Sequence, residues 1–373
     1  MLASLNMQAI VLDRFGGPEE LRLREIPEPH ATGSEVRIRV HAVAINHLDV
    51  DIRQGTSRFP VEFPLVLGRE SVGVVDEIGP EVQDVDIGDR VVVLPIQPCG
   101  QCDVCRAGFD NLCSNAGKPG ISHPGGYAEF TVAPANAVMK LPATVSFPYG
   151  AAAAVSFGTA HHILRGLAQV SPGEWLVVTG AAGGLGSACV QLGSLLGAKV
   201  IAAAGSKEKA DLAVTFGAAH AIDYSKHDLT EALLDTTNGY GVDVAVEHIG
   251  GHTFEQVLQA MAIRGRMIVA GGHAGEIVRV DLIPFFRREI VLRGARSQTR
   301  ADIVVVLNLI SLGKLRPHVE LLRGLDSIPD IHRRLSERRV TGKIVVIPDG
   351  IDDGTSTAFD RGTSQSAPVE LPG

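Results

Sequence analysis

The first part of the chain, up to about residue 150, alternates short apolar runs with turn signals. Glycines, prolines and polar residues separate the runs, and few stretches have a helical period. Runs of this length and spacing are typical of an all-β unit with little helix. The sequence therefore predicts strands in the segments EVRIRVHAVAI (35–45), SVGVVDEIG (71–79), DRVVVLP (89–95) and GGYAEFTV (125–132).

From Glu174 onward, continuously apolar runs alternate with helical segments. Strands that are buried on both faces of a parallel sheet are expected to be continuously apolar. Strand, helix and strand in repetition indicate a doubly wound parallel sheet, so the predicted fold class is α/β. The predicted strands are WLVVT (175–179), KVIAAA (199–204), HAIDY (220–224), VDVAVEHI (242–249), RMIVAGG (266–272) and EIVLRGA (289–295), with helices such as 206–217 and 252–263 between them.

The last part of the chain contains a helical segment (301–315) and an apolar strand (342–348), which could return to the first unit. Residues 349–373 are small, polar and acidic, with almost no apolar periodicity. Such a segment buries too little apolar surface to offset its ordering entropy. We expect a disordered tail.

Composition places the chain among globular proteins, because 45% of its residues are hydrophobic and 20% are charged. The charges sum to 34 − 42 = −8, and no long basic run offers a surface for nucleic acid. Residues 175–198 carry no charge, but their glycines and their change of period favour a strand-to-helix turn over a membrane span. No secretory signal is visible at the N-terminus, so we expect a cytoplasmic location.

A glycine-rich loop, T-G-A-A-G-G-L-G, follows the predicted strand 175–179 and opens an apolar helix. Gly183 would let the backbone approach a pyrophosphate, and Gly186 would let the helix pack on the strand. Such a triplet can also be a plain tight turn, but its place between a strand and a helix indicates dinucleotide binding. The candidate loop residues are Ala181, which stands where the motif has its first glycine, and Gly183, Gly184, Leu185 and Gly186.

The end of the second predicted strand bears on which dinucleotide binds. An NAD site usually carries Asp or Glu about 20 residues after the loop, whereas this strand ends in Ala204 and Gly205. Ser206, Lys207 and Lys209 follow, and a hydroxyl and two ammonium groups suit the 2′-phosphate of NADPH. We expect NADPH. The alternative is that the lysines belong to a solvated helix start.

Four of the five cysteines lie in one loop with the spacing C-x2-C-x2-C-x7-C. Four thiolates from one loop can close a tetrahedral shell around zinc, without an open position for a substrate. Cys189, in an apolar helix, is most simply a buried small hydrophobe. We expect one structural Zn²⁺ per chain, held by Cys99, Cys102, Cys105 and Cys113.

The four-cysteine lobe, the segment GGYAEF (125–130) and the loop AAGGLG, in this order, resemble the medium-chain dehydrogenase/reductase superfamily. The resemblance runs from about Met7 to Pro348. It implies a GroES-like catalytic domain (1–155, completed by 300–348) and an inserted Rossmann domain (156–299), with a small-molecule substrate and the nicotinamide in the cleft between them.

Zinc-dependent alcohol dehydrogenases of this superfamily hold a catalytic zinc with a Cys, a His and a further Cys or Asp. The resemblance places Asn46, Arg69 and Val155 at these positions. Leu48 stands where those enzymes have the Ser or Thr that relays the proton. An amide oxygen is a poor zinc ligand, and guanidinium and isopropyl groups are none. We expect no catalytic metal. Arg69 is expected to pair with Glu70 in the vacated volume, or to anchor an anionic substrate.

The remaining motif residues resemble the quinone oxidoreductases and related enoyl reductases of the superfamily. These residues are Asn46, Asp49, the Ser206-x-x-Lys209 pair and Tyr224. This branch implies NADPH, no catalytic zinc and reduction of quinones or α,β-unsaturated carbonyl compounds. The chain nevertheless keeps the structural zinc lobe, which many members of the branch lack.

Three side chains are candidates for the reaction itself. We expect Asn46 to donate a hydrogen bond to the acceptor oxygen and Thr159 to help place the nicotinamide ring. Asp49 could take part in catalysis or cap a helix that begins VDIRQG, and both possibilities stay open. The basic run 333–339 is interpreted as a solvated helix face.

Two rival functions remain. One is an alcohol or aldehyde dehydrogenase with a relocated metal site, and the other is a non-catalytic NADP-binding protein. The resemblance also implies a homodimer or homotetramer, with 289–295 as a candidate contact strand.

Overall fold

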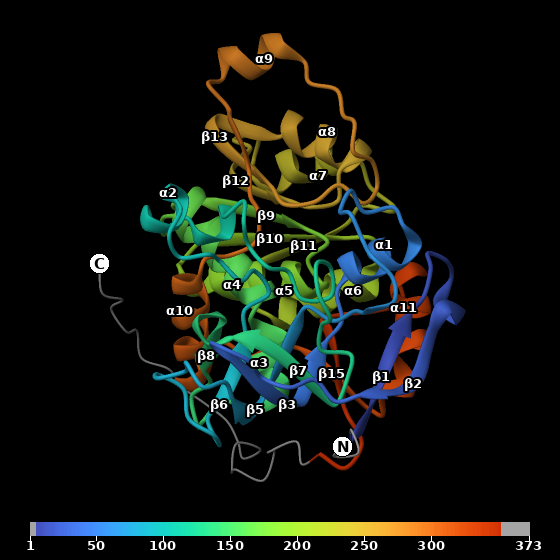
Figure 1. The fold of residues 1–373 in the computed structure, drawn as a ribbon. Coiled ribbons are helices and arrows are strands. Elements are labelled where there is room, and N and C mark those ends of the chain that lie inside the picture. The colour runs from blue at the N-terminus through green and yellow to red at the C-terminus, as the bar shows by residue number, and fades with distance from the viewer. Residues whose placement is uncertain (1–4, 352–373) are drawn as a thin grey trace.

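Three β-sheets organise residues 5–351, the part of the chain that the computed structural model describes (Figure 1). Two mostly antiparallel sheets form the β-rich part, and a six-stranded parallel sheet forms the other part. The predicted α/β class, a β-rich unit with a doubly wound parallel sheet, is confirmed. The predicted tail falls outside the described residues from residue 352 onward.

Along the strands of the β-rich part, side chains alternate between the two faces, and the apolar ones point into the core. In β3, Val36 and Ile38 are fully buried, whereas Arg39 is exposed. The strand predicted at 125–132 is shorter, because residues 125–127 bond to the backbone of residues 66–68 before β7 begins. The strands are β1 (Asn6–Leu12), β2 (Leu21–Pro27) and β4 (Leu65–Val66) in the small sheet, and β3 (Glu35–Ala44), β5 (Glu70–Ile78), β6 (Arg90–Val93), β7 (Phe130–Pro134), β8 (Val138–Lys140), β15 (Val319–Arg323) and β16 (Lys343–Ile347) in the large one.

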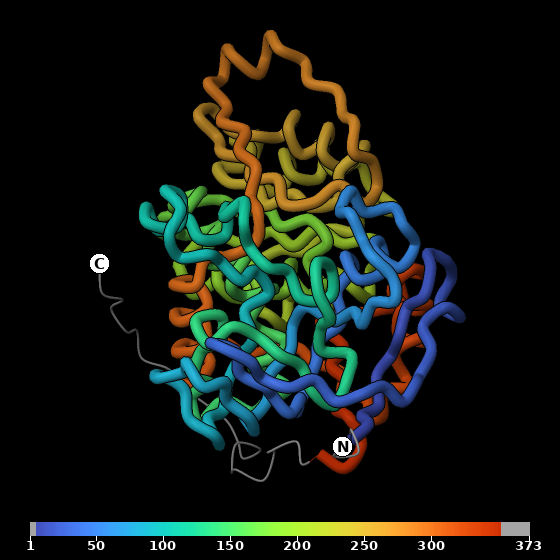
Figure 2. Tube along the Cα trace, viewed as in Figure 1, coloured from blue at the N-terminus to red at the C-terminus, as the bar shows by residue number. Residues whose placement is uncertain are grey.

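The end of the described chain returns to its beginning. β16 pairs antiparallel with β3 and parallel with β15, so the C-terminal segment completes the first large sheet. Figure 2 shows this red segment running back among the blue N-terminal strands. The boundary residues 155/156 and 299/300 themselves stay a prediction.

The parallel sheet has the strand order β11-β10-β9-β12-β13-β14. This is the order 3-2-1-4-5-6 of dinucleotide-binding sheets, which binds its ligand where the order reverses, beside β9. The helix predicted at 252–263 ends early, because Met261 already pairs with Val242 and begins β13. The strands are β9 (Trp175–Thr179), β10 (Lys199–Ala204), β11 (His220–Asp223), β12 (Val242–Glu247), β13 (Met261–Val269) and β14 (Val291–Gly294).

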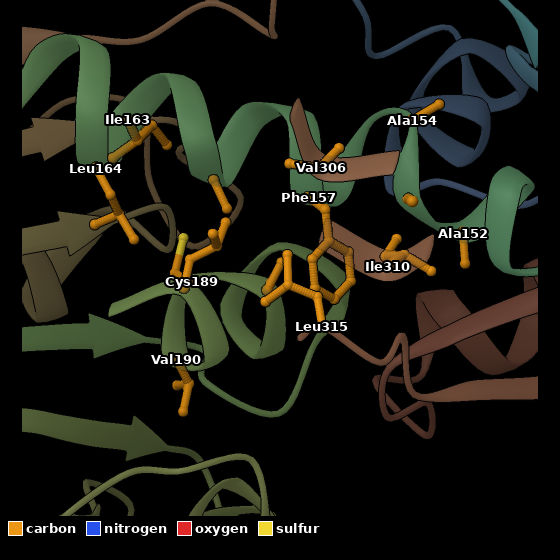
Figure 3. Close-up of a cluster of buried hydrophobic side chains, with 14 of the residues drawn as sticks. Ala152, Ala154, Phe157, Ile163, Leu164, Cys189, Val190, Val306, Ile310 and Leu315 are labelled. Carbon is orange, nitrogen blue, oxygen red and sulfur yellow. The ribbon is translucent and has the colours of Figure 1, made fainter. Parts of the chain in front are cut away.

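Helices join the two parts through one continuous core. Phe157 of α4 points toward Leu315, Ile310 and the apolar side of α5 (Figure 3). Among the described residues, no helix combines the length and the apolar character that a membrane crossing needs. The helices are α1 (His47–Gln54), α2 (Asp103–Arg106), α3 (Phe147–Ala153), α4 (Ser156–His161, continued by a π-helical turn His162–Leu167), α5 (Gly184–Leu195), α6 (Lys207–Thr215), α7 (Leu229–Thr236), α8 (Gly251–Gln259), α9 (Leu282–Arg287), α10 (Arg300–Ser311) and α11 (Ile328–Ser336).

Asp49 caps a helix, although not from the position that the sequence predicts. Helix α1 begins at His47 rather than at Val50, with Asn46 as its N-cap residue. The Asp49 carboxylate reaches back and accepts the backbone N–H of Asn46 at 2.8 Å. The same oxygen accepts the Tyr127 hydroxyl at 3.0 Å. Asp49 is fully buried, and burial raises its pKa to about 6. Its carboxylate is therefore engaged in the capping of α1.

The pH dependence of stability tests this buried carboxyl group. Because the pKa of Asp49 is higher in the folded chain than in the unfolded one, the folded state takes up a proton first as the pH falls. The free energy of unfolding of the natural protein should therefore rise, relative to Asp49→Asn, by on the order of 2 kcal/mol between pH 7 and pH 4.5. Urea unfolding at both pH values measures this difference. The exposed Asp84→Asn serves as the control, and an equal difference at both pH values for Asp49→Asn would contradict the prediction.

Candidate functional site

The glycine loop lies at the carboxyl end of β9, at the point where the strand order reverses. Gly180 has φ +56°, in the left-handed region that favours glycine. A Cβ at Gly186 would lie 2.2 Å from the Gly180 carbonyl oxygen, so the close packing of helix on loop requires glycine there. A Cβ at Gly183 would meet that oxygen at 3.4 Å and nothing else within 4 Å. Gly186 is thus packed tightly against the loop, whereas the side of Gly183 is free of close neighbours. This arrangement fits a pyrophosphate at the start of α5.

The other candidate loop residues lie between β9 and the first turn of α5. Ala181 is buried, and its N–H bonds to the carbonyl of Ala203 in β10. Gly184 and Leu185 form the first turn of α5. The carbonyl of Ala182 accepts the N–H of Gly342 at 2.7 Å, so the C-terminal segment crosses directly beside the loop.

Tyr224 and Ser206 lie beside the end of β10. A Cβ at Gly205 would lie 3.3 Å from the Tyr224 hydroxyl oxygen, so Tyr224 stands directly over this glycine. Ser206 is the N-cap of α6, where its hydroxyl accepts the N–H of Lys209. Asp223, at the end of β11, turns one carboxylate oxygen to the hydroxyl and the N–H of Ser225.

The two candidate lysines beside this site are engaged with the protein. Lys207 pairs with Asp211 on the surface of α6, as the solvated-helix alternative expects. Lys209 donates to the carbonyl oxygen of Arg338 at 2.6 Å. Arg338 lies beyond α11, which ends at Ser336, with a left-handed backbone (φ +57°). Its charge acts on both Tyr224 and His47.

Sequence analysis missed this role of Arg338, because it treated the whole basic run as one helix face. The run leaves the helix after Ser336, and Arg338 lies close enough to Tyr224 for its charge to act on that side chain. Lys209, which bonds to the Arg338 carbonyl, lies 129 positions earlier in the sequence, and no local pattern predicts this contact.

A buried ion pair lies beside Asn46 and Val155, two of the three positions at which the resemblance places the zinc ligands of alcohol dehydrogenases. Glu70 is fully buried and Lys343 is 6% exposed. The Lys343 ammonium donates to a Glu70 carboxylate oxygen and to the Asn46 amide oxygen, both at 2.8 Å, and to the Ile45 carbonyl at 3.1 Å. The other Glu70 oxygen accepts the N–H of Val155 at 2.6 Å. The Lys343 ammonium group therefore lies among Ile45, Asn46 and Glu70.

The expected pair of Arg69 with Glu70 is wrong. Arg69 instead donates to the carbonyl oxygen of Pro95 at 3.2 Å. Arg69 lies in a bend directly before β5, whereas Glu70 is the first residue of that strand, and the two side chains reach different partners. The partner of Glu70 is Lys343, which is 273 positions further along the chain. Lys343 could have been noticed as a single charge at the start of an otherwise continuously apolar strand.

Thr159 lies in α4, four residues after Val155, and is buried. Its hydroxyl donates to the side-chain oxygen of Gln298 at 3.0 Å, and the Ser297 hydroxyl donates to the same oxygen. Gln298 is a second residue that sequence analysis missed. It holds the Thr159 hydroxyl in one orientation, with the hydroxyl lone pairs left to accept further bonds.

Three histidines gather at the carboxyl end of the parallel sheet. The rings of His47 and His273 lie 5.2 Å apart, and His273 is 3.7 Å from the Asp51 carboxylate. Burial lowers the pKa of His47 and of His248 to about 4 in each case. Both rings are therefore neutral at pH 7, and the positive charges of Arg338 and Lys343 act on His47 in the same direction as its burial.

The four cysteines converge as a tetrahedral metal site requires. All four sulfurs lie within 4.8 Å of one another, and three of the separations are 3.4, 3.5 and 3.9 Å. A zinc ion about 2.3 Å from each of four sulfurs holds them about 3.8 Å apart. The thiol set therefore fits a structural zinc. Cys189 is buried in α5, as expected.

The cysteine lobe is fastened to the segment that carries Gln298. Asn111, two residues before Cys113, donates to the carbonyl oxygen of Arg296 at 2.7 Å. Asp110 accepts the N–H of Arg300 at the start of α10. The lobe thus supports the chain on both sides of Gln298.

Comparison with known proteins places the chain in a family. The family model described as "Alcohol dehydrogenase GroES-like domain" matches residues 32–143, and the model described as "Zinc-binding dehydrogenase" matches residues 184–311. An alcohol dehydrogenase of Geobacillus stearothermophilus is 31% identical over 345 residues, which cover 91% of this chain and 98% of that protein. The quinone oxidoreductase-like protein 2 homolog of Nematostella vectensis is 32% identical, over 91% of this chain and 88% of its own length.

Solved structures give the same result. The crystal structure of AibC has a TM-score of 0.86 at 35% identity and covers 93% of this chain and 97% of its own. An NAD-dependent alcohol dehydrogenase has a TM-score of 0.86 at 36% identity, covering 91% and 99%. The chain is therefore an oxidoreductase with a GroES-like part and a Rossmann-type sheet, and it belongs to the medium-chain dehydrogenase/reductase superfamily.

Proposed function

We propose that this protein is an NADPH-dependent reductase of quinones or α,β-unsaturated carbonyl compounds that works without a catalytic metal. The observation that supports this proposal is the Lys343 ammonium, which bonds to Glu70 and to Asn46, one of the positions where the resemblance implies a zinc ligand. With Asn46, Arg69 and Val155 at the three ligand positions, the chain has neither thiolate nor imidazole there.

The acceptor class follows from this lack of a Lewis acid. NADPH supplies the hydride when it is bound. An acceptor that delocalises the arriving charge over a conjugated system needs less help from the protein than a simple carbonyl does. The Asn46 amide lies beside the ion pair and is half-buried, so its N–H can reach an acceptor oxygen. Thr159, held by Gln298, is positioned to help place the nicotinamide.

Three features favour NADPH over NADH. The strand β10 ends in Ala204 without a carboxylate that would repel a 2′-phosphate. The N-terminus of α6 offers backbone donors at that point. Lys209 ties Arg338 to the same region, and Arg338 acts electrostatically on Tyr224. A guanidinium group is well suited to bind phosphate.

The remaining parts of the proposal concern the state of the protein. One zinc per chain would be bound by the four cysteines, in a reducing cytoplasmic setting that keeps thiols free. A homodimer or homotetramer would take small-molecule substrates. The domain division at 155/156 and 299/300 is part of the same proposal.

Elemental analysis of the protein purified in metal-free buffer tests the metal assignment. Within residues 5–351, the four cysteines are the one group of three or more potential ligands that lie close enough to hold a metal. We therefore expect about one zinc per chain. Two zinc ions per chain, together with chelator-sensitive alcohol oxidation, would favour an alcohol dehydrogenase with a relocated metal.

Steady-state consumption of NADPH tests the reaction. We expect turnover with quinones or enones and none with ethanol and NADP⁺. Asn46→Ala should lower kcat/KM by about 100–1000-fold, the usual effect of removing one donor from a developing oxyanion. Asn308→Ala, on the exposed side of α10, is the matched control and should leave kcat/KM unchanged. Tight NADPH binding without turnover of any acceptor would instead favour a non-catalytic binding protein.

Cofactor titrations with two variants test the binding site. Gly183→Ala should fold normally, because its Cβ meets nothing closer than 3.4 Å and its φ of −80° suits alanine. It should raise Kd about tenfold or more for NADPH and NADH alike, because the methyl group lies where the pyrophosphate approaches. Arg338→Gln should raise Kd about tenfold for NADPH but less than about twofold for NADH, because only NADPH carries the 2′-phosphate that the guanidinium would bind. Equal effects of Arg338→Gln on both cofactors would refute the role of Arg338.

A further inference from the structure

The Lys343 side chain joins the phosphate loop to the proposed acceptor site. Its neighbour Gly342 donates its N–H to the Ala182 carbonyl of the loop. Its own aliphatic chain lies against Gly184, where a Cβ would be only 2.7 Å from the lysine Cδ. From there the side chain extends to the Asn46 amide and the Glu70 carboxylate. One residue therefore contacts both the cofactor side and the acceptor side of the cleft.

The bonds of Lys343 fix the orientation of the Asn46 amide. An ammonium group only donates and an ionised carboxylate only accepts. The amide oxygen of Asn46 must therefore face Lys343, at 2.8 Å, and its NH₂ group must face Glu70, at 3.1 Å. A flipped amide would place a donor against the ammonium. The rotamer and the flip state of Asn46 are thus set by a cation and an anion together.

One hydrogen of the Asn46 amide has no short bond within the described residues. The first NH₂ hydrogen is directed at Glu70, and the nearest partner for the second is the Ala44 carbonyl at 3.5 Å, the outer limit for a hydrogen bond. The ammonium bonded to the amide oxygen withdraws electron density from the amide nitrogen, which strengthens its N–H groups as donors. The three hydrogens of Lys343 itself are all used, by Ile45, Asn46 and Glu70.

We propose that Lys343 is a positioning residue that takes over, through Asn46, the charge-stabilising task of a catalytic metal. It orients and polarises the Asn46 amide so that the second N–H binds the acceptor oxygen as negative charge develops there. This inference rests on the proposed function. It assigns the acceptor a carbonyl oxygen that gains charge when hydride arrives at a conjugated carbon, as in quinones and enones.

The competing explanation is that Lys343 merely neutralises the buried Glu70. Two variants separate the two explanations. Lys343→Met leaves an unpaired buried carboxylate and is expected to be unstable. The double variant Lys343→Met/Glu70→Gln removes both charges and keeps the side-chain volumes, so it should fold. If Lys343 serves only charge balance, the double variant should be as active as the natural protein.

The experiment measures kcat, acceptor KM, NADPH Kd and Tm for the zinc-loaded proteins with a quinone that the natural protein reduces. For the double variant we expect kcat to fall about 10–100-fold, with NADPH Kd within about threefold of the natural value and with a Tm that is not lowered. The single variant Lys343→Arg, which keeps the charge and the donors, should retain most of the natural kcat. Lys314→Met, an exposed lysine of the same C-terminal segment, is the control and should match the natural protein.

The outcomes separate the two proposals. A double variant with natural kcat, beside an active natural protein, overturns the role of Lys343 and leaves the proposed function intact. A double variant that binds NADPH more weakly but keeps the natural kcat also overturns the role of Lys343, because Lys343 would then serve cofactor binding alone. Absence of turnover by the natural protein with every quinone and enone overturns the proposed function and this role together.

Discussion

The buried ion pair of Glu70 and Lys343 is the interaction on which the geometry of the cleft depends. A fully buried carboxylate is costly unless it is paired and hydrogen-bonded, and this one receives Lys343, the Asn46 amide and the Val155 N–H. These donors come from β16, from the residue before α1 and from the residue before α4. The pair therefore connects β16 of the C-terminal segment to the residues directly before α1 and α4.

A second support comes from the other side of α4. The cysteine lobe binds the Arg296 carbonyl through Asn111, and Gln298, two residues further on, holds the Thr159 hydroxyl. Thr159 is thus positioned by a lobe whose own shape depends on four thiolates being kept together. A structural zinc at Cys99, Cys102, Cys105 and Cys113 would in this way stabilise the proposed nicotinamide side of the cleft without contacting any reactant.

What could be predicted from the sequence was local, and what could not depended on distant contacts. The glycine loop and the cysteine spacing are motifs within short segments, and the apolar runs mark buried strands. These local patterns predict the strands and the two kinds of site. Lys343, Arg338 and Gln298 act through residues 129 to 297 positions away, and no local pattern marks such partners. The Arg69–Glu70 pair failed for a local reason: Arg69 lies in the bend before β5, and its guanidinium donates to the Pro95 carbonyl instead.

The ammonium group that we propose in place of a catalytic metal bears on which reactions the cleft can support. Zinc offers an open coordination position that binds an alkoxide, whereas the three N–H groups of Lys343 are all used within the protein. Oxidation of an alcohol also needs a group that takes its proton, but Leu48 is apolar and Asp49 is buried against Asn46 and Tyr127. A conjugated carbonyl compound needs neither. It spreads the incoming charge over its own atoms and requires from the protein one well-oriented N–H, which is what the Asn46 amide, held between a cation and an anion, presents.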